Sequence, residues 1–156
     1  MAPNKRKPKP ASSMYPSLHG DVSSLLADDN LRFTFHPNGV DSQASRTHDT
    51  NIMGYFACNN PQCANKGWAS KRIAITIRMF EGRKYNASVW HQHCKSCDAI
   101  SKPKVDDSYA DRVAYRLKKF CGIQMEPPFY DKKRGKPHRS YLCEGCKAGH
   151  CTEGGL

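Results

Sequence analysis

The chain has 156 residues, of which 38% are hydrophobic, and its formal net charge is +11. This length fits one domain of ordinary size, and the low apolar content indicates a modest core that bound metal ions can reinforce. No stretch approaches the roughly 20 apolar residues that a membrane-spanning helix requires, so the composition excludes membrane insertion and favours a soluble, basic protein that binds polyanions, most commonly nucleic acid.

Residues 1–13 are predicted to be a disordered basic tail, because they are rich in Lys, Pro and Ser and lack an apolar pattern. The run KRKPK resembles a short nuclear localisation signal, although a plain electrostatic tail has the same composition. No apolar signal region follows Met1, so we expect a nuclear or cytoplasmic protein that is not secreted. In those reducing compartments, cysteines bind metal more often than they form disulfides.

Residues 14–53 are predicted to pack on the domain as a helix, a strand and a loop. Apolar residues recur at helical spacing in residues 15–30, which indicates a short amphipathic helix docked on the domain. The segment LRFTFH, residues 31–36, alternates apolar and polar residues as a half-buried strand does. Residues 38–51 are polar and without periodicity, and we expect them to form a loop.

The strongest strand signal is RIAITIRMF, residues 72–80, which places three isoleucines and a methionine on one face. A turn over residues 81–83 precedes a second alternating segment, residues 85–93, so the two segments are predicted to form a β-hairpin. This hairpin returns the chain from Cys58 and Cys63 to Cys94 and Cys97, as a zinc ribbon requires.

Residues 108–120 change to a helical period, with an apolar stripe that indicates an amphipathic helix ending at Gly122. Ser108 and Asp111 are a candidate capping pair. The basic residues of this helix lie away from the stripe, so we expect them on an exposed side: Arg112, Arg116, Lys118 and Lys119. Residues 126–136, EPPFYDKKRGK, are predicted to form a turn and a basic loop.

Four cysteines in two pairs form the first predicted metal site: Cys58, Cys63, Cys94 and Cys97. Thiolates five or fewer residues apart can share one tetrahedral zinc ion, and two such pairs close a structural site without an open coordination position. Ordinary buried thiols are the alternative, but paired spacing of this kind rarely arises by chance. His91 and His93 flank the second pair, either as hydrogen-bonding neighbours of the sulfurs or as surface histidines.

The second predicted metal site uses the ligands His138, Cys143, Cys146 and Cys151. A glycine-containing loop can return Cys151 to the pair that precedes it, and His138 lies five residues before Cys143. His150 and Cys121 stay open as alternative ligands. His150 is beside Cys151 and less able to reach the ion, while Cys121 follows a helix as a small core residue does. The predicted cofactor is therefore two structural Zn²⁺ ions.

The motifs CNNPQC, HQHCKSC and PHRSYLCEGCKAGHC resemble those of the 3CxxC-type zinc-finger family, particularly its fungal members. The likeness covers about residues 50–151, so residues 54–151 are expected to be the zinc-binding domain and residues 152–156 a flexible C-terminus. Upstream, HGDVSSLL and FTFHPNGV also look similar to fungal members. The first cysteine pair is separated by four residues here rather than two, which lengthens that turn. We expect an α+β fold with a zinc-ribbon-like antiparallel sheet and one or two short helices.

The same family includes the receptor-transporting proteins, which help odorant receptors reach the cell surface, and the zygote arrest proteins, which bind maternal messenger RNA. The resemblance implies RNA binding as one activity, and we expect nucleic acid, RNA over DNA, as the partner. Basic residues are the candidate phosphate contacts. They are Arg112, Arg116, Lys119, Lys132, Lys133, Arg134, Lys136 and Arg139.

Two other classes of function compete with nucleic-acid binding. A cytosolic protein-interaction or chaperone adaptor is suggested by the trafficking members of the family and by the amphipathic helix near Leu25. A zinc enzyme is not expected, since nucleobase deaminases need a His-x-Glu motif and a Pro before the Cys-x-x-Cys, and the chain has neither. Catalytic zinc also keeps an open coordination position, whereas both predicted sites use four protein ligands.

Overall fold

The computed structural model describes residues 10–38, 40–123 and 140–151. Its strands are β1 (Ser12–Ser13), β2 (Thr34–Phe35), β3 (Arg46–Ala57), β4 (Gly67–Phe80), β5 (Lys84–Trp90), β6 (Gln92–His93), β7 (Ile100–Ser101) and β8 (Pro103–Val105). Its helices are α1 (His19–Ala27), α2 (Ser108–Phe120) and α3 (Glu144–Lys147), with 3-10 turns at Pro16–Leu18, Asp41–Gln43 and Ser140–Leu142. Within these ranges, no helix has the length and apolar character needed to cross a membrane.

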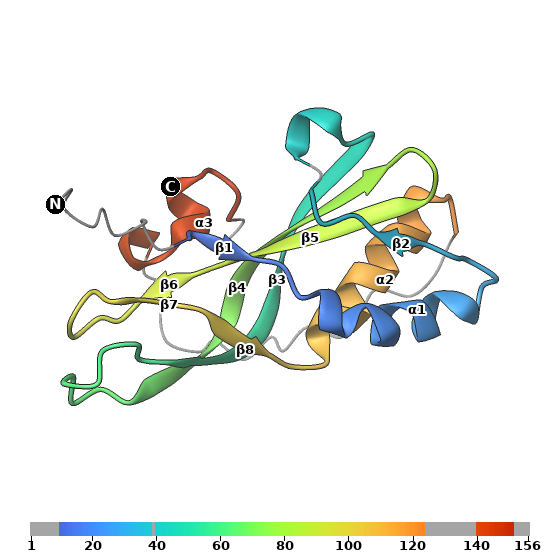
Figure 1. Cartoon of the computed structure of the whole chain (residues 1–156). Helices are drawn as coiled ribbons and strands as arrows, with labels where there is room; N and C mark the ends of the chain where they lie inside the picture. The colour runs from blue at the N-terminus through green and yellow to red at the C-terminus, as the bar shows by residue number, and fades with distance from the viewer. Residues whose placement is uncertain (1–9, 39, 124–139, 152–156) are drawn as a thin grey trace, which may run out of the picture.

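A six-stranded sheet forms the centre of the fold, with strand order β1-β5-β4-β3-β8 and with β2 pairing β5 in parallel (Figure 1). The other pairs in this sheet are antiparallel, and β6 and β7 form a separate two-stranded ribbon. This mixture of an antiparallel sheet with a few short helices confirms the expected α+β fold.

The predicted β-hairpin is confirmed as β4 and β5. Ile75 pairs with Val89 and Ile77 with Ala87, so the apolar sides of both strands share one face. Gly82 has a φ of +82° in the connecting turn, a left-handed conformation that glycine adopts without strain. Apolar residues recur at every second position of residues 72–80 because this segment is a central strand of the sheet and one of its faces lies against the core.

Helices α1 and α2 pack side by side and cover the apolar face of the sheet (Figure 1). Val22 and Leu26 of α1 and Val113 and Leu117 of α2 are all 0% exposed. Each such side chain contributes about 1.5–3 kcal/mol through burial. Both predicted helices are thus confirmed, the first as the shorter α1. Ser108 does not cap α2, because its hydroxyl oxygen accepts a hydrogen bond from the Met53 N–H (2.8 Å).

The predicted loop over residues 38–51 is wrong in its second half, where β3 begins at Arg46. Asp49 pairs with Thr76 and Thr50 with Ile75 along β4. The Thr76 hydroxyl donates to the Asp49 carboxylate (2.7 Å), so the polar residues of β3 have polar partners on their own face. A long neighbouring strand, rather than the residues themselves, makes this segment extended.

Two predictions for the N-terminal part of the chain are also wrong in part. Residues 12–13, expected in the disordered tail, form β1 and pair with Trp90 and Val89 of β5. Within the predicted strand over residues 31–36, only Thr34–Phe35 pair with β5, although Phe33 is buried and Thr34 exposed as the alternation requires. The Ala11 carbonyl, also in the predicted tail, accepts the His91 N–H (2.8 Å). Residues 1–9 of the tail and the predicted flexible C-terminus, residues 152–156, lie outside the described residues.

Candidate metal centres

Two turns at one end of the sheet carry the first cysteine cluster. Cys58 and Cys63 lie in the turn between β3 and β4, and Cys94 and Cys97 lie in the turn between β6 and β7. Figure 1 shows these two turns side by side, away from α1 and α2. In the second turn, the Asp98 N–H donates to the Cys94 carbonyl (2.8 Å), which closes a tight loop around the cysteine pair.

The sulfurs of this cluster are spaced for a tetrahedral zinc ion. Cys58 Sγ lies 3.6 Å from Cys97 Sγ, and Cys63 Sγ lies 3.9 Å from Cys94 Sγ. All four sulfurs are within 4.8 Å of one another. Sulfurs bound to zinc at about 2.3 Å are about 3.8 Å apart in a tetrahedron, whereas a disulfide bond measures about 2 Å. All eight cysteines are free thiols, so the donor set fits zinc.

Hydrogen bonds around Cys94 favour its ionised form. Burial by itself raises the pKa of this thiol, but the backbone N–H groups of Ser96 and Cys97 and the neighbouring thiols lower the pKa to about 6. The Asn65 side-chain N–H also donates to Cys94 Sγ (3.4 Å). Such donors stabilise a thiolate, which is the form that binds a metal ion. Asn65 is two residues beyond Cys63, but its type and spacing carry no signal that predicts this contact.

The second cluster brings together Cys143, Cys146 and Cys151, whose sulfurs also lie within 4.8 Å of one another. Cys143 precedes α3, and its sulfur accepts the N–H of Cys146 (3.4 Å) at the start of that helix. Gly149, at a φ of +78°, turns the chain back towards Cys151. Hydrogen bonding to Cys151 and burial raise the pKa of the Cys143 thiol. A divalent cation removes this obstacle to ionisation by neutralising the sulfurs.

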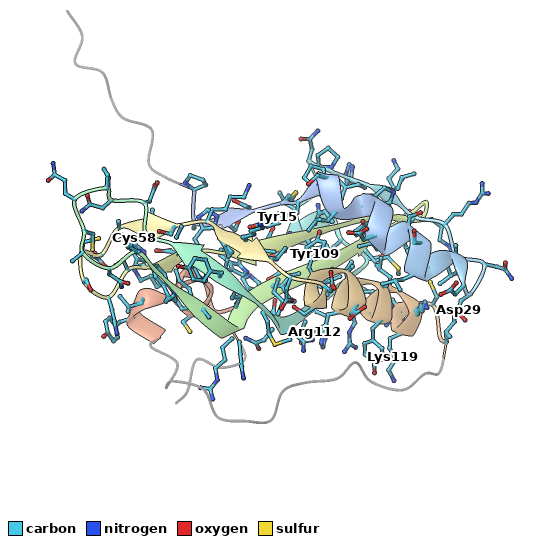
Figure 2. All side chains as sticks on the ribbon, turned by 90° about the horizontal axis from the view of Figure 1, so that it is seen from below. Tyr15, Asp29, Cys58, Tyr109, Arg112 and Lys119 are labelled. Carbon is cyan, nitrogen blue, oxygen red and sulfur yellow. The ribbon has the colours of Figure 1, made fainter. Side chains whose placement is uncertain are left out.

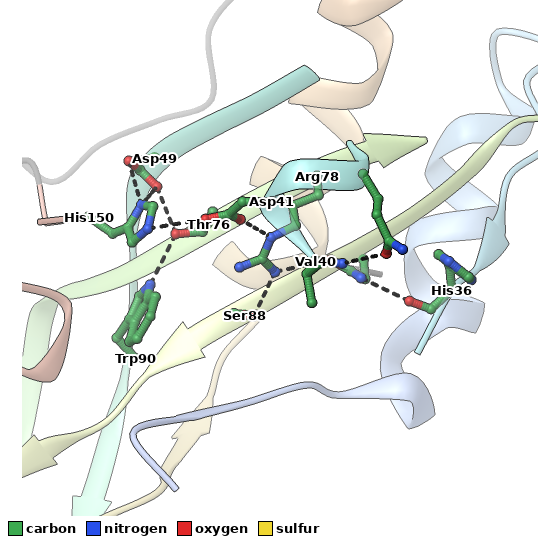
Figure 3. A network of polar contacts seen from close by, with 11 residues as sticks. His36, Val40, Asp41, Asp49, Thr76, Arg78, Ser88, Trp90 and His150 are labelled. Carbon is green, nitrogen blue, oxygen red and sulfur yellow. Dashed lines mark hydrogen bonds and ion pairs between the residues drawn. The ribbon is translucent and has the colours of Figure 1, made fainter. Parts of the chain in front are cut away.

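Among the described residues, no fourth ligand joins the three cysteines of the second cluster. His138 lies outside the described ranges, and the two alternatives face elsewhere. The ring of His150 stacks on Trp90 at 5.4 Å between centroids, and its Nδ1 lies 3.0 Å from the Asp49 carboxylate (Figure 3). Cys121 belongs to neither cluster and accepts a hydrogen bond from Arg83 (3.2 Å).

The second cluster is fixed to the polar face of the sheet. A Cβ atom at Gly145 would lie 2.6 Å from the Ala74 Cβ, so only glycine lets α3 approach β4 this closely. The Trp90 Nε1–H donates to the Thr76 hydroxyl (3.0 Å), which donates to the same Asp49 carboxylate that contacts His150 (Figure 3). The spacing of the cysteines does not predict these contacts, because they join segments far apart in the sequence.

Arg112, predicted to be an exposed nucleic-acid contact, is buried instead. Its side chain is 3% exposed and its guanidinium donates to the Asn51 carbonyl (2.6 Å), so it ties α2 to β3 instead of facing solvent (Figure 2). Lys118 is also buried, in an ion pair with Asp29 (2.6 Å). Because α2 packs on both α1 and the sheet, residues beside its apolar stripe are covered as well. Lys119 is exposed, as predicted.

The remaining predicted contacts divide into two groups. Arg116 is half-buried, with its guanidinium 5.5 Å from the ring centre of Tyr115. The other candidates lie outside the described residues: Lys132, Lys133, Arg134, Lys136 and Arg139. Exposed lysines that the sequence did not single out lie on the two turns that carry the first cluster and on β4 and β8, and we call them the lysine surface: Lys66, Lys71, Lys95 and Lys104. They were missed because they are scattered along the chain rather than grouped in one run.

The family comparison agrees with this geometry. The 3CxxC zinc-ribbon model, a zinc-binding domain, matches residues 51–149, which include every clustered cysteine except Cys151. No curated protein and no solved structure matches the chain. The match covers more than half of the sequence, and both cysteine clusters suit a zinc ion. The chain therefore belongs to the 3CxxC zinc-ribbon family of zinc-binding domains.

Proposed function

We propose that this zinc-binding domain is a non-catalytic nucleic-acid-binding module that prefers RNA to DNA. The observation that carries the proposal is the lysine surface, which lies on the strands and turns that the first cysteine cluster holds in place. At this end of the molecule, residues 58–72 and 91–104 contain six Lys and Arg against one acidic residue. A zinc tetrathiolate carries a charge of about −2, so this end of the molecule stays positive when the ion is bound.

Phosphate neutralisation supplies most of the affinity of such a surface. Lysine side chains on zinc-supported turns need little ordering when they bind a polyanion, because the backbone beneath them is already fixed. Each phosphate contact with a single strand contributes about −0.7 to the slope of log affinity against log salt. Binding is therefore expected to weaken steeply as salt rises.

Fluorescence polarisation tests the proposal directly. Fluorescein-labelled single-stranded RNA, single-stranded DNA of the same sequence and an RNA duplex are titrated with the full chain at several salt concentrations. The proposal predicts salt-dependent binding that is tightest for RNA and that is lost when a chelator removes zinc. An absence of binding to every probe at low salt would overturn it.

The adaptor alternative has less support. The helix that suggested it, α1, packs Val22 and Leu26 into the core, and Leu25 is partly buried against the same core. No exposed apolar stripe is left on this helix for a protein partner. A pull-down with and without nuclease separates the two functions, since partners that survive nuclease treatment favour the adaptor.

A further inference from the structure

Tyr55 is an exposed aromatic side chain within the sheet, and neither the core nor the metal sites account for it. It is 48% exposed, whereas its neighbour Phe56 is 0% exposed. Successive side chains of a strand point to opposite faces, so Tyr55 projects from the face opposite to the one on which Phe56 is buried. A single exposed apolar residue is ordinary by itself, and the case for Tyr55 depends on what surrounds it.

The backbone of the neighbouring strands holds the Tyr55 ring. Tyr55 pairs with Ala69 of β4 on one side and with Lys104 of β8 on the other. A Cβ atom at Gly67 would lie 2.4 Å from the Tyr55 hydroxyl oxygen and 2.8 Å from Cζ. The ring therefore leans diagonally over Gly67, one strand away and two residues from Ala69. It is supported from below and accessible to solvent on the side that faces away from the sheet.

Positive charges stand around this ring. Lys104 is the direct cross-strand neighbour of Tyr55 on β8, and Lys71 follows Ala69, its neighbour on β4, by two residues. Both lysines are exposed. The nearest acidic residue along β8 is Asp106, whose carboxylate accepts the Ser108 N–H (2.8 Å) at the start of α2. The ring thus combines an open aromatic face with cations on both sides.

We propose that Tyr55 stacks on an unpaired base of a bound RNA strand while Lys71 and Lys104 contact the phosphates beside it. This site rests on the proposed function and specifies where on the molecule the strand binds. Aromatic side chains on a sheet surface hold splayed bases in this way in proteins that bind single strands. A duplex keeps its bases stacked inside, so the site selects single strands.

A competing explanation is that the Tyr55 ring only covers Gly67. An aromatic ring over a strand glycine stabilises a sheet without any ligand. The test therefore compares Tyr55→Leu, which covers Gly67 without a stacking ring, with Tyr55→Phe, which keeps the ring. Tyr115→Leu is the matched control on α2, where the Tyr115 ring also lies beside basic residues, Arg116 and Lys119. Circular dichroism and zinc content confirm that each variant is folded.

Two labelled RNA strands supply the readout: a short single strand of mixed sequence and the same strand with abasic sites in place of its bases. Tyr55→Leu is expected to weaken binding to the first strand by about five- to 150-fold, the range measured for the loss of one base stack, and to leave binding to the abasic strand unchanged. Tyr55→Phe and Tyr115→Leu are expected to bind like the wild-type protein.

The other outcomes overturn the site in distinguishable ways. If Tyr55→Leu binds the first strand like the wild type, or loses affinity equally for both strands, the ring does not stack on a base. If Tyr115→Leu alone weakens binding, the strand lies on α2 instead. A wild-type protein that binds no strand removes the proposed function and this site with it.

Discussion

The imidazole Nε2 of His93 and the carboxylate of Glu144 form a hydrogen bond that joins the two cysteine clusters. His93 immediately precedes Cys94, a ligand candidate of the first cluster, and Glu144 immediately follows Cys143 of the second. A backbone bridge between Gln92 and Cys143 runs beside this contact. The hydrogen bond between His93 and Glu144 therefore links residues that are adjacent to the two candidate metal sites.

Glu144→Gln should separate the release of the two zinc ions. Wild-type protein is expected to lose both ions together as chelator is added, because ordering one cluster orders the other through the His93 contact. Without the carboxylate this charge-assisted hydrogen bond is weakened, and native mass spectrometry should detect a species with one zinc ion. Glu81→Gln, at an exposed turn, is the control. Equal amounts of the one-zinc species in both variants would contradict the coupling.

Gly145→Ala should destabilise the protein by about 1–3 kcal/mol, the usual range for overpacking. The added methyl group would lie 2.6 Å from the Ala74 Cβ and 3.2 Å from Trp90, so α3 must move away from the sheet. Gly20→Ala is the matched control, since a Cβ there meets nothing within 4 Å and alanine favours the helix. Urea unfolding in the presence of zinc measures both. Equal stability of the two variants would show that α3 does not dock as described.

Substitutions of Arg112 and Lys104 should have opposite effects: the first should change stability, and the second should change RNA affinity. Arg112→Met removes a buried guanidinium and its bond to the Asn51 carbonyl, which should lower the free energy of unfolding by about 1.5–3 kcal/mol and leave RNA affinity unchanged. Lys104→Gln should leave stability unchanged and reduce the salt slope of RNA binding by about 0.7. Polarisation titrations and urea unfolding provide the two readouts. A loss of RNA affinity in folded Arg112→Met would return Arg112 to the binding surface.

His48 should make stability fall in mild acid. Burial and the nearby Arg116 guanidinium lower its pKa below the ordinary value, although Asp49 opposes the shift. Above the pKa that His48 has in the unfolded chain, its imidazole is neutral in both states and does not affect the free energy of unfolding. As the pH falls from that value towards the lower pKa of the folded state, the unfolded chain takes up the proton more readily, and the fold is destabilised. Unfolding of the wild type and of His48→Gln is compared from neutral pH to about pH 5. The wild type should lose more stability, and parallel curves would contradict this.

Local patterns in the sequence predict the parts of this fold that depend on neighbouring residues. The alternation of residues 72–80 indicates β4 because one face of that strand is apolar and buried. The spacing of Cys143 and Cys146 likewise predicts that their sulfurs lie together, with Cys143 at the N-cap of α3 and Cys146 within that helix. Periodicity and ligand spacing are both short-range properties, so they can be read without knowing the topology.

Contacts between distant segments could not be predicted in the same way. The polar segment that becomes the first half of β3 is extended because β4 lies beside it, and its partner Thr76 is 27 residues from Asp49. Arg112 is buried because two other elements cover the sides of α2, which no helical period reveals. His93 and Glu144 are 51 residues apart, and their meeting depends on how both cysteine clusters fold.

Two thiolate clusters bind zinc and thereby maintain this fold. Native mass spectrometry of the reduced chain, before and after chelation, combined with circular dichroism of the same samples, measures this dependence. We expect two zinc ions per chain and a loss of folded structure once chelator removes them. A chain that carries no zinc, or that keeps its folded spectrum with chelator in excess and its cysteines joined as disulfides, would contradict it.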